Sequence, residues 1–268
     1  MEMLLKVLGT ALAAFALLVA LNWMLQDRYI FYPRPPSSDK PRAPVGYRLE
    51  ELTLAMSDGK RLETWLTAPI ANDKSPLVIY FGGNAEEVSS GVPLADRYAG
   101  FAALFVNYRG YGRSEGKPGE RELFSDALEI YDQMTKRPDI DARRIVVHGV
   151  SLGSGVAVFL ASQRPVRAVI LTAPYDSIRA MGEAMMPYLP VSMILRHPFD
   201  SLSRAPSISA PLLCLAATQD EVIPITRSRR LFDAWGGPKA FREISNEGHN
   251  TIGQASEYWR AIAEFLST

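Results

Sequence analysis

The hydropathy pattern begins with an uninterrupted apolar run near the N-terminus. From Val7 to Leu25 only Thr10 and Asn22 are clearly polar, and no charged residue occurs. A helix of this length crosses roughly 30 Å of hydrocarbon. We therefore predict a single-pass membrane-anchor helix over residues 1–27, with a cleaved signal peptide and a monotopic or core helix as alternatives. Aromatic residues typical of a membrane interface lie at its far end: Trp23, Tyr29, Phe31 and Tyr32.

The basic residues around the apolar run do not determine on which side of the membrane the domain lies. Lys6 is the only one before the run, so counting Lys and Arg favours a cytoplasmic domain. Large domains, however, translocate with little regard to nearby charge. The sequence therefore predicts an anchor without settling its orientation. The basic residues that follow the run are Arg28, Arg34, Lys40 and Arg42.

A linker and a hairpin follow the apolar run. Residues 28–46 are rich in proline and charged residues, which predicts an extended linker. Two strand-like runs, 47–54 and 62–67, flank Ser57-Asp58-Gly59-Lys60. An Asp-Gly pair between such runs predicts an antiparallel hairpin.

From residue 77 onward, short apolar runs alternate with longer helical segments. Continuous apolar runs without alternation are typical of strands that helices cover on both faces. The predicted fold is α/β, with a mostly parallel central sheet and helices on both faces, in a domain spanning residues 47–268. The expected strands are 77–81, 103–108, 144–150, 168–173, 212–217 and 240–244. The expected helices lie near 85–98, 119–136, 153–163, 224–235 and 254–267.

One connection, residues 174–211, is far longer than an ordinary strand-to-helix connection. It is rich in large apolar residues and holds four of the nine methionines. Because methionine adapts its shape to varied apolar partners, we predict a helical lid over about residues 175–210. Met181, Met185 and Met186 are the candidate substrate-binding residues. The alternative is that these side chains only pack the lid onto the domain.

Composition excludes several classes of protein. The formal net charge is zero and no long run of one sign occurs, so no nucleic-acid partner is expected. Cys214 is the only cysteine, which excludes an intrachain disulfide, and its apolar neighbours predict a buried thiol. No clustered ligand set or phosphate loop occurs, so we expect neither a metal nor another cofactor.

The candidate nucleophile is Ser151. Gly149-Val150-Ser151-Leu152-Gly153 matches the pattern G-x-S-x-G, and it lies between a predicted strand and a predicted helix. In this context the sharp turn raises the serine hydroxyl above the sheet and requires small residues two positions before and after it. The alternative is an ordinary glycine-rich turn.

His249 is the candidate base among three histidines. In this type of fold the nucleophile, acid and base follow one another in the order Ser, Asp or Glu, His. Only His249, on a loop before the last helix, satisfies that order with an acid in between. His148 lies on the strand that leads to Ser151, and His197 lies within the lid.

Asp220 is the candidate acid that orients the imidazole. It follows the strand 212–217, so it lies at the carboxyl edge of the sheet where Ser151 and His249 also emerge. An Asp at this place also serves as a helix N-cap, which is the alternative role. Asp176 is the alternative acid, because it too follows a strand at that edge.

An oxyanion intermediate requires two converging N–H donors. One is expected from the backbone of Leu152, directly after the nucleophile. The other is expected from the loop Phe81-Gly82-Gly83-Asn84-Ala85, with the Asn84 amide as first choice and Gly83 as second. A turn without a catalytic role is the alternative.

Taken in order, these motifs resemble those of the membrane-anchored α/β-hydrolases of the YfhR-like kind, near relatives of monoacylglycerol-lipase-type serine hydrolases. The resemblance covers nearly the whole chain and implies an α/β-hydrolase fold and ester hydrolysis without a cofactor. Its motifs are the apolar span, Arg28–Pro33 as Arg-Tyr-x-x-Tyr-Pro, the oxyanion loop, Asn107–Ser114, the nucleophile turn, Asp220–Pro224 and Gly248-His249-Asn250.

Two departures from the family pattern occur. Residue 82 is glycine where the family usually has histidine, and Ala216-Ala217 replaces the usual His-Gly. The first removes a side chain that normally braces the oxyanion loop, which predicts a looser loop and a lower rate. Neither departure touches a candidate triad residue.

The sequence as a whole predicts a membrane-anchored serine hydrolase. It would cleave carboxylic or thio esters of acyl or lipid-like substrates through an acyl-enzyme on Ser151, with the lipid bilayer as the partner of its N-terminal helix. A serine peptidase or amidase and a catalytically silent membrane scaffold are the alternatives.

Overall fold

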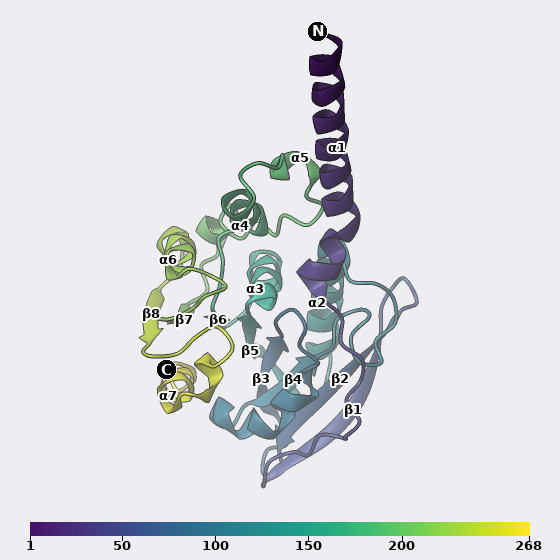
Figure 1. Cartoon of the computed structure of the whole chain (residues 1–268). Helices are drawn as coiled ribbons and strands as arrows, with labels where there is room; N and C mark the ends of the chain where they lie inside the picture. The colour runs from purple at the N-terminus through teal and green to yellow at the C-terminus, as the bar shows by residue number, and fades with distance from the viewer.

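The computed structural model describes residues 1–268 and contains one eight-stranded sheet, helices on both of its faces and a long N-terminal helix. Figure 1 shows this helix, α1, projecting away from the body of the molecule. The strands are β1 (Tyr47–Ala55), β2 (Arg61–Pro69), β3 (Ser75–Phe81), β4 (Ala102–Val106), β5 (Ile140–Val150), β6 (Ala168–Thr172), β7 (Leu212–Ala217) and β8 (Lys239–Ile244). The α-helices are α1 (Glu2–Phe31), α2 (Glu120–Met134), α3 (Leu152–Gln163), α4 (Ile178–Met185), α5 (Val191–Ile194), α6 (Ile225–Ala234) and α7 (Ser256–Leu266). The 3₁₀ segments are η1 (Val88–Tyr98), η2 (Ala205–Ser207) and η3 (Ile252–Gln254).

The strand order across the sheet is β1-β2-β4-β3-β5-β6-β7-β8. The predicted hairpin is confirmed, since β1 and β2 pair antiparallel with Ala55 opposite Arg61. β2 also pairs antiparallel with β4, and every other pair is parallel. The predicted mostly parallel sheet is therefore correct, and this is the strand arrangement of the α/β-hydrolase fold.

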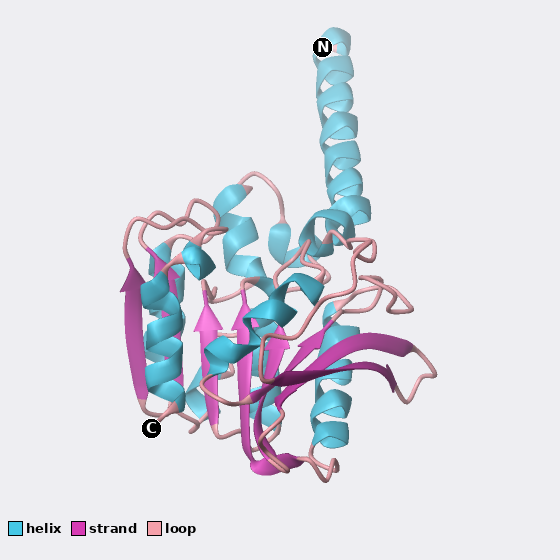
Figure 2. Ribbon diagram, turned by 90° about the horizontal axis from the view of Figure 1, so that it is seen from below, coloured by secondary structure: helices cyan, strands magenta, loops and turns pink.

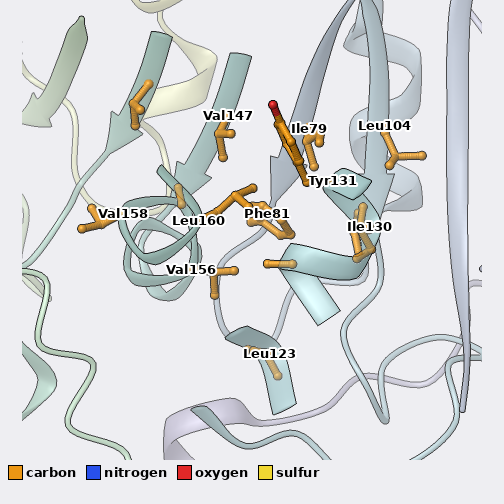
Figure 3. Close-up of a cluster of buried hydrophobic side chains, with 14 of the residues drawn as sticks. Ile79, Phe81, Leu104, Leu123, Ile130, Tyr131, Val147, Val156, Val158 and Leu160 are labelled. Atoms are coloured by element: carbon orange, nitrogen blue, oxygen red, sulfur yellow. The ribbon is translucent and has the colours of Figure 1, made fainter. Parts of the chain in front are cut away.

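Helices cover both faces of the sheet, as Figure 2 shows. In β3, Leu77, Ile79 and Phe81 belong to the apolar cluster under α2 and α3, whereas Val78 belongs to the cluster under η1 and α7. Figure 3 shows Ile79 and Phe81 together with side chains of α2 and α3. Each large aliphatic side chain that is fully buried in this way contributes about 1.5–3 kcal/mol. Cys214 is buried, as predicted.

The N-terminal helix runs further than expected. It ends at Phe31 rather than at 27, so the linker begins at Tyr32, which adopts a left-handed conformation (φ 47°) before Pro33. The extra turn is stable because it has partners in the domain. Phe31 is fully buried and packs edge-on against His197 and Phe199.

The outer part of α1 is long and apolar enough to cross a membrane, and its most apolar stretch is not buried against the domain. A core helix is thereby excluded, and a membrane anchor, a monotopic helix and a signal sequence remain. The lid connection contains α4 and α5, and Figure 1 shows both on the side of the body from which α1 projects.

Candidate active site

The strand-to-helix turn holds Ser151 in a backbone conformation that side chains rarely adopt, with φ 50° and ψ −115°. The glycines two residues before and after it are sterically required. A Cβ on Gly149 would lie 2.3 Å from the carbonyl oxygen of Gly153, and a Cβ on Gly153 would lie 2.1 Å from that of Phe81. The turn therefore presses α3 against β3 and points the serine hydroxyl away from the sheet.

The structure joins the three candidate side chains in one chain of hydrogen bonds. Nε2 of His249 lies 3.0 Å from Oγ of Ser151, and Nδ1 lies 2.8 Å from Oδ2 of Asp220. With Nδ1–H donating to the carboxylate, Nε2 is left to accept the serine proton. Because the parallel strands end at the same edge of the sheet, residues far apart in sequence meet there.

Backbone donors fix the Asp220 carboxylate. Its Oδ1 accepts from the N–H groups of Val222 (2.9 Å) and Ile223 (2.7 Å), so Oδ2 remains for His249. Burial raises the pKa of this carboxyl, but the hydrogen bonds from His249 and from the two backbone groups outweigh it, and the net pKa lies below the ordinary value. The carboxylate is thus charged at neutral pH.

The alternative acid does not reach this chain of hydrogen bonds. Asp176 is buried, and its Oδ2 accepts from Arg227 (3.0 Å) and Arg230 (3.4 Å) instead. These contacts tie α6 to the strand end after β6.

The other two histidines have structural partners elsewhere. His148 is fully buried between Tyr98 (2.8 Å) and Thr172 (3.0 Å), and burial lowers its pKa to about 3. His197 joins the lid to α1 through Asp27 (2.9 Å).

Two backbone donors beside Ser151 are free to bind an oxyanion. The N–H groups of Leu152 and Asn84 have no hydrogen-bond partner, and both residues line a cavity with Ser151. The N–H of Gly83 instead donates to Oε2 of Glu86 at 2.7 Å. The geometry thus favours Asn84 over Gly83, the second choice, as the donor from this loop.

The predicted oxyanion loop is braced, contrary to the looser loop expected from Gly82. The Glu86 carboxylate occupies the space next to residue 82, since a Cβ there would lie 2.9 Å from Oε2. Oε1 also accepts from the hydroxyl of Tyr80 (2.8 Å), and the hydroxyl of Tyr108 donates to the Gly82 carbonyl (2.8 Å). Burial raises the pKa of the Glu86 carboxyl. Sequence reasoning missed Glu86, whose only signal is an acidic residue three positions after Gly83.

A cavity of about 340 Å³ opens on one side of Ser151. Fourteen of its 19 lining residues are hydrophobic, and none is charged. The candidate residues Met181, Met185 and Met186 all line it. The structure therefore places them in the same cavity as Ser151, in a setting suited to an apolar group.

A second cavity of about 790 Å³ opens on the other side of Ser151 and is polar. Only eight of its 21 lining residues are hydrophobic. His249 lines this cavity and does not line the apolar one. Its polar lining includes Arg34, Glu86, Glu87 and Asn250.

Comparison with known proteins connects this geometry to a family. The family described as serine aminopeptidase, S33, matches residues 73–199. The Mycobacterium tuberculosis protein Rv2307c is 34% identical over 85% of this chain and 82% of its own length. The yeast membrane protein YNL320W is 30% identical over 82% of this chain and 80% of its own length. Escherichia coli YfhR is 27% identical over 82% of this chain and 79% of its own.

Solved structures share the fold at low sequence identity. An acetyl xylan esterase from Paenibacillus has a TM-score of 0.67 at 20% identity, with 83% of this chain and 84% of that chain covered. Dipeptidyl peptidase 4 from Porphyromonas gingivalis has a TM-score of 0.66 at 18% identity, covering 82% of this chain and 35% of that one. Such likeness concerns the fold alone and includes both esterases and peptidases.

Proposed function

The chain belongs to the α/β-hydrolase superfamily, in its YfhR-like group, and from this premise we propose that it is a membrane-anchored serine esterase acting on acyl or lipid-like esters. One observation carries the proposal: the Ser151–His249–Asp220 relay lies where an apolar cavity meets a polar one. An amphiphilic ester has the same two parts on either side of its carbonyl.

In the proposed reaction Ser151 Oγ attacks the ester carbonyl while its proton passes to Nε2 of His249. Asp220 holds the imidazole and stabilises its charged form. The N–H groups of Leu152 and Asn84 bind the negative oxygen of the tetrahedral intermediate. The carbon–oxygen bond then breaks, and the alcohol leaves with the proton from His249. Water hydrolyses the acyl-Ser151 ester by the same steps, with His249 again as base.

The position of His249 orients the substrate. Since His249 protonates the leaving group, the alcohol must depart on the side that this histidine lines, which is the polar cavity. The acyl group then lies in the apolar cavity with Met181, Met185 and Met186. This arrangement supports acyl esters over aminopeptidase substrates, because a free N-terminal ammonium would lie in a cavity without any charged partner.

The membrane anchor is part of the proposal. The outer half of α1 exposes large apolar side chains over several turns, which water disfavours and lipid accepts. Removal of α1 as a signal peptide would also remove Gln26 and Phe31, two buried residues of the folded domain. The yeast relative is described as a membrane protein.

Activity-based labelling tests the proposal. A fluorophosphonate probe should label the full-length protein at Ser151, and Ser151→Ala should abolish both labelling and hydrolysis of p-nitrophenyl acyl esters. Ser162→Ala, on the same helix and away from both cavities, is the matched control and should label normally. Preference for aminoacyl-nitroanilides over acyl esters would favour a peptidase, and a folded protein without labelling would leave only the silent scaffold.

A further inference from the structure

One face of the N-terminal helix forms a wall of the apolar cavity. Four residues of α1 line it: Asn22, Gln26, Tyr29 and Ile30. They are spaced i, i+4, i+7 and i+8, so they share one side of the helix. The facing wall is the lid, which contributes residues of α4 and α5.

Buried polar contacts hold this wall against the lid. Gln26 is 2% exposed, and its amide donates to the carbonyl of Ile194 (3.0 Å) and accepts from the N–H of Arg196 (2.7 Å). Asp27 accepts from Arg196 (2.7 Å) and pairs with His197 (2.9 Å). Because the donors and acceptors of the Gln26 amide are satisfied away from water, while the Asp27 contacts lie nearer the surface, Gln26 gives the helix and the lid a defined relative position.

The C-terminal end of α1 contacts the predicted oxyanion loop. The N–H of Ala85 donates to the carbonyl of Phe31 (3.1 Å), and the side-chain amide of Asn84 donates to the carbonyl of Tyr29 (3.5 Å). Ile30 is therefore at the catalytic end of the cavity wall. Asn22 lies about two turns nearer the N-terminus of α1 and forms the end of the cavity wall that is farthest from Ser151.

We propose that the membrane-anchor helix is itself part of the acyl-binding site, with the substrate's acyl chain lying along Asn22–Ile30 between α1 and the lid. This rests on the proposed function, which supplies Ser151 as the nucleophile. Eight residues of α-helix rise about 12 Å. An extended chain advances about 1.2 Å per bond, so about ten carbons span the wall.

The surroundings of the cavity indicate where such a chain comes from. The lid exposes three large side chains that are apolar or amphipathic: Met185, Tyr188 and Met193. They belong to the side of the body from which α1 projects (Figure 1). The lid therefore rests at the membrane surface, and the substrate class is a membrane-resident ester with one acyl chain of medium to long length.

Tryptophan substitutions along the wall test how far the acyl chain extends from Ser151. The assay uses full-length protein in detergent micelles and p-nitrophenyl esters from acetate to palmitate, with kcat/KM as readout. Asn22→Trp fills the distal end, so it should lower kcat/KM for dodecanoate at least tenfold more than for acetate. Met24→Trp is the matched control, since Met24 is exposed on the opposite face of α1 and should keep the wild-type chain-length profile.

A second pair tests the facing wall. Ile194 lines the cavity, whereas its neighbour Met193 is 83% exposed and does not, so Ile194→Trp should shorten the preferred chain and Met193→Trp should not. If fluorophosphonate labels both cavity variants while their chain-length profiles stay wild-type, the inference is overturned. Failure of the unchanged protein to label would overturn the proposed function instead.

Discussion

Replacing Glu86 with alanine removes the carboxylate that holds the predicted oxyanion loop, Phe81–Ala85. Oε2 accepts the Gly83 N–H at 2.7 Å, and Oε1 accepts from the Tyr80 hydroxyl at 2.8 Å. Without them the Gly83 N–H, in a buried part of the loop, has no partner. The adjacent Asn84 N–H then loses its fixed direction toward the space beside Ser151.

The size of the effect follows from the hydrogen bonds that the substitution removes. An unsatisfied buried donor costs about 1–3 kcal/mol. If the activation free energy rises by that amount, kcat falls by about 5- to 150-fold, since each 1.36 kcal/mol corresponds to a factor of about ten. Loss of a whole oxyanion donor, about 10²–10³-fold, is the upper limit. KM should change little, because the oxyanion exists only after the serine has attacked.

The assay is steady-state hydrolysis of p-nitrophenyl butyrate by full-length Glu86→Ala, with two matched variants. Glu86→Gln keeps the shape and an acceptor for Gly83, so its loss should be much smaller. Tyr80→Phe removes only the second partner of the carboxylate and should also lose little. An unchanged kcat in Glu86→Ala would refute the bracing role.

Residue 82 provides a further check on the same reasoning. A Cβ at Gly82 meets the Glu86 carboxylate at 2.9 Å, so Gly82→His alone should displace that carboxylate and lower kcat. In the Glu86→Ala background only Cγ1 of Val88, at 3.1 Å, remains close to that Cβ, so a small shift of Val88 lets the family's usual histidine brace the loop. The double variant should therefore exceed both single variants in kcat, a strongly non-additive result.

Two remaining predictions concern the acid and a buried histidine. Asp220→Asn should lower kcat by about 10⁴-fold, as loss of the orienting carboxylate does in other Ser-His-Asp enzymes, whereas Asp176→Asn should keep kcat but lower the urea midpoint, because it weakens the contacts with Arg227 and Arg230. His148 stays neutral in the folded state, since burial lowers its pKa from 6.5 to about 3. The unfolded chain therefore takes up a proton first, so stability present above pH 6.5 is lost as the pH falls, by about 2 kcal/mol at pH 5. Urea unfolding of His148→Gln at pH 7.5 and 5 should lack this loss, and an unchanged pH dependence would contradict it.

The central sheet could be predicted from the sequence because each strand has its own recognisable hydropathy pattern. The run Leu77–Phe81 is apolar without alternation, since its odd and even positions enter two different clusters under two layers of helices. The positions of the candidate triad also followed from local patterns, because a strand end fixes where the next residue emerges. Their meeting required only that parallel strands end at one edge.

What the sequence could not supply were contacts between segments without a shared pattern. Residues 7–21 of α1 are apolar on nearly every side, and the polar residues that follow them are too few to establish a periodicity for the face that lines the cavity. The polar residue Gln26 gave a signal only once Ile194 and Arg196 were known to lie beside it. In the same way, the contact of Glu86 with Gly83 depends on a loop conformation that no propensity encodes.

The contacts at the C-terminal end of α1 indicate what the proposed anchor would do for catalysis. A tether needs only a flexible linker, which would leave the domain free to turn above the bilayer. Here α1 continues without a break into a fully buried residue, Phe31, whose carbonyl accepts from both Ala85 of the oxyanion loop and the Tyr111 hydroxyl. Through Gln26 the same helix holds the lid. Because one rigid element contacts the lid, the cavity and the predicted oxyanion loop, the proposed membrane anchor would set the direction of the bilayer relative to Ser151 through the fold itself.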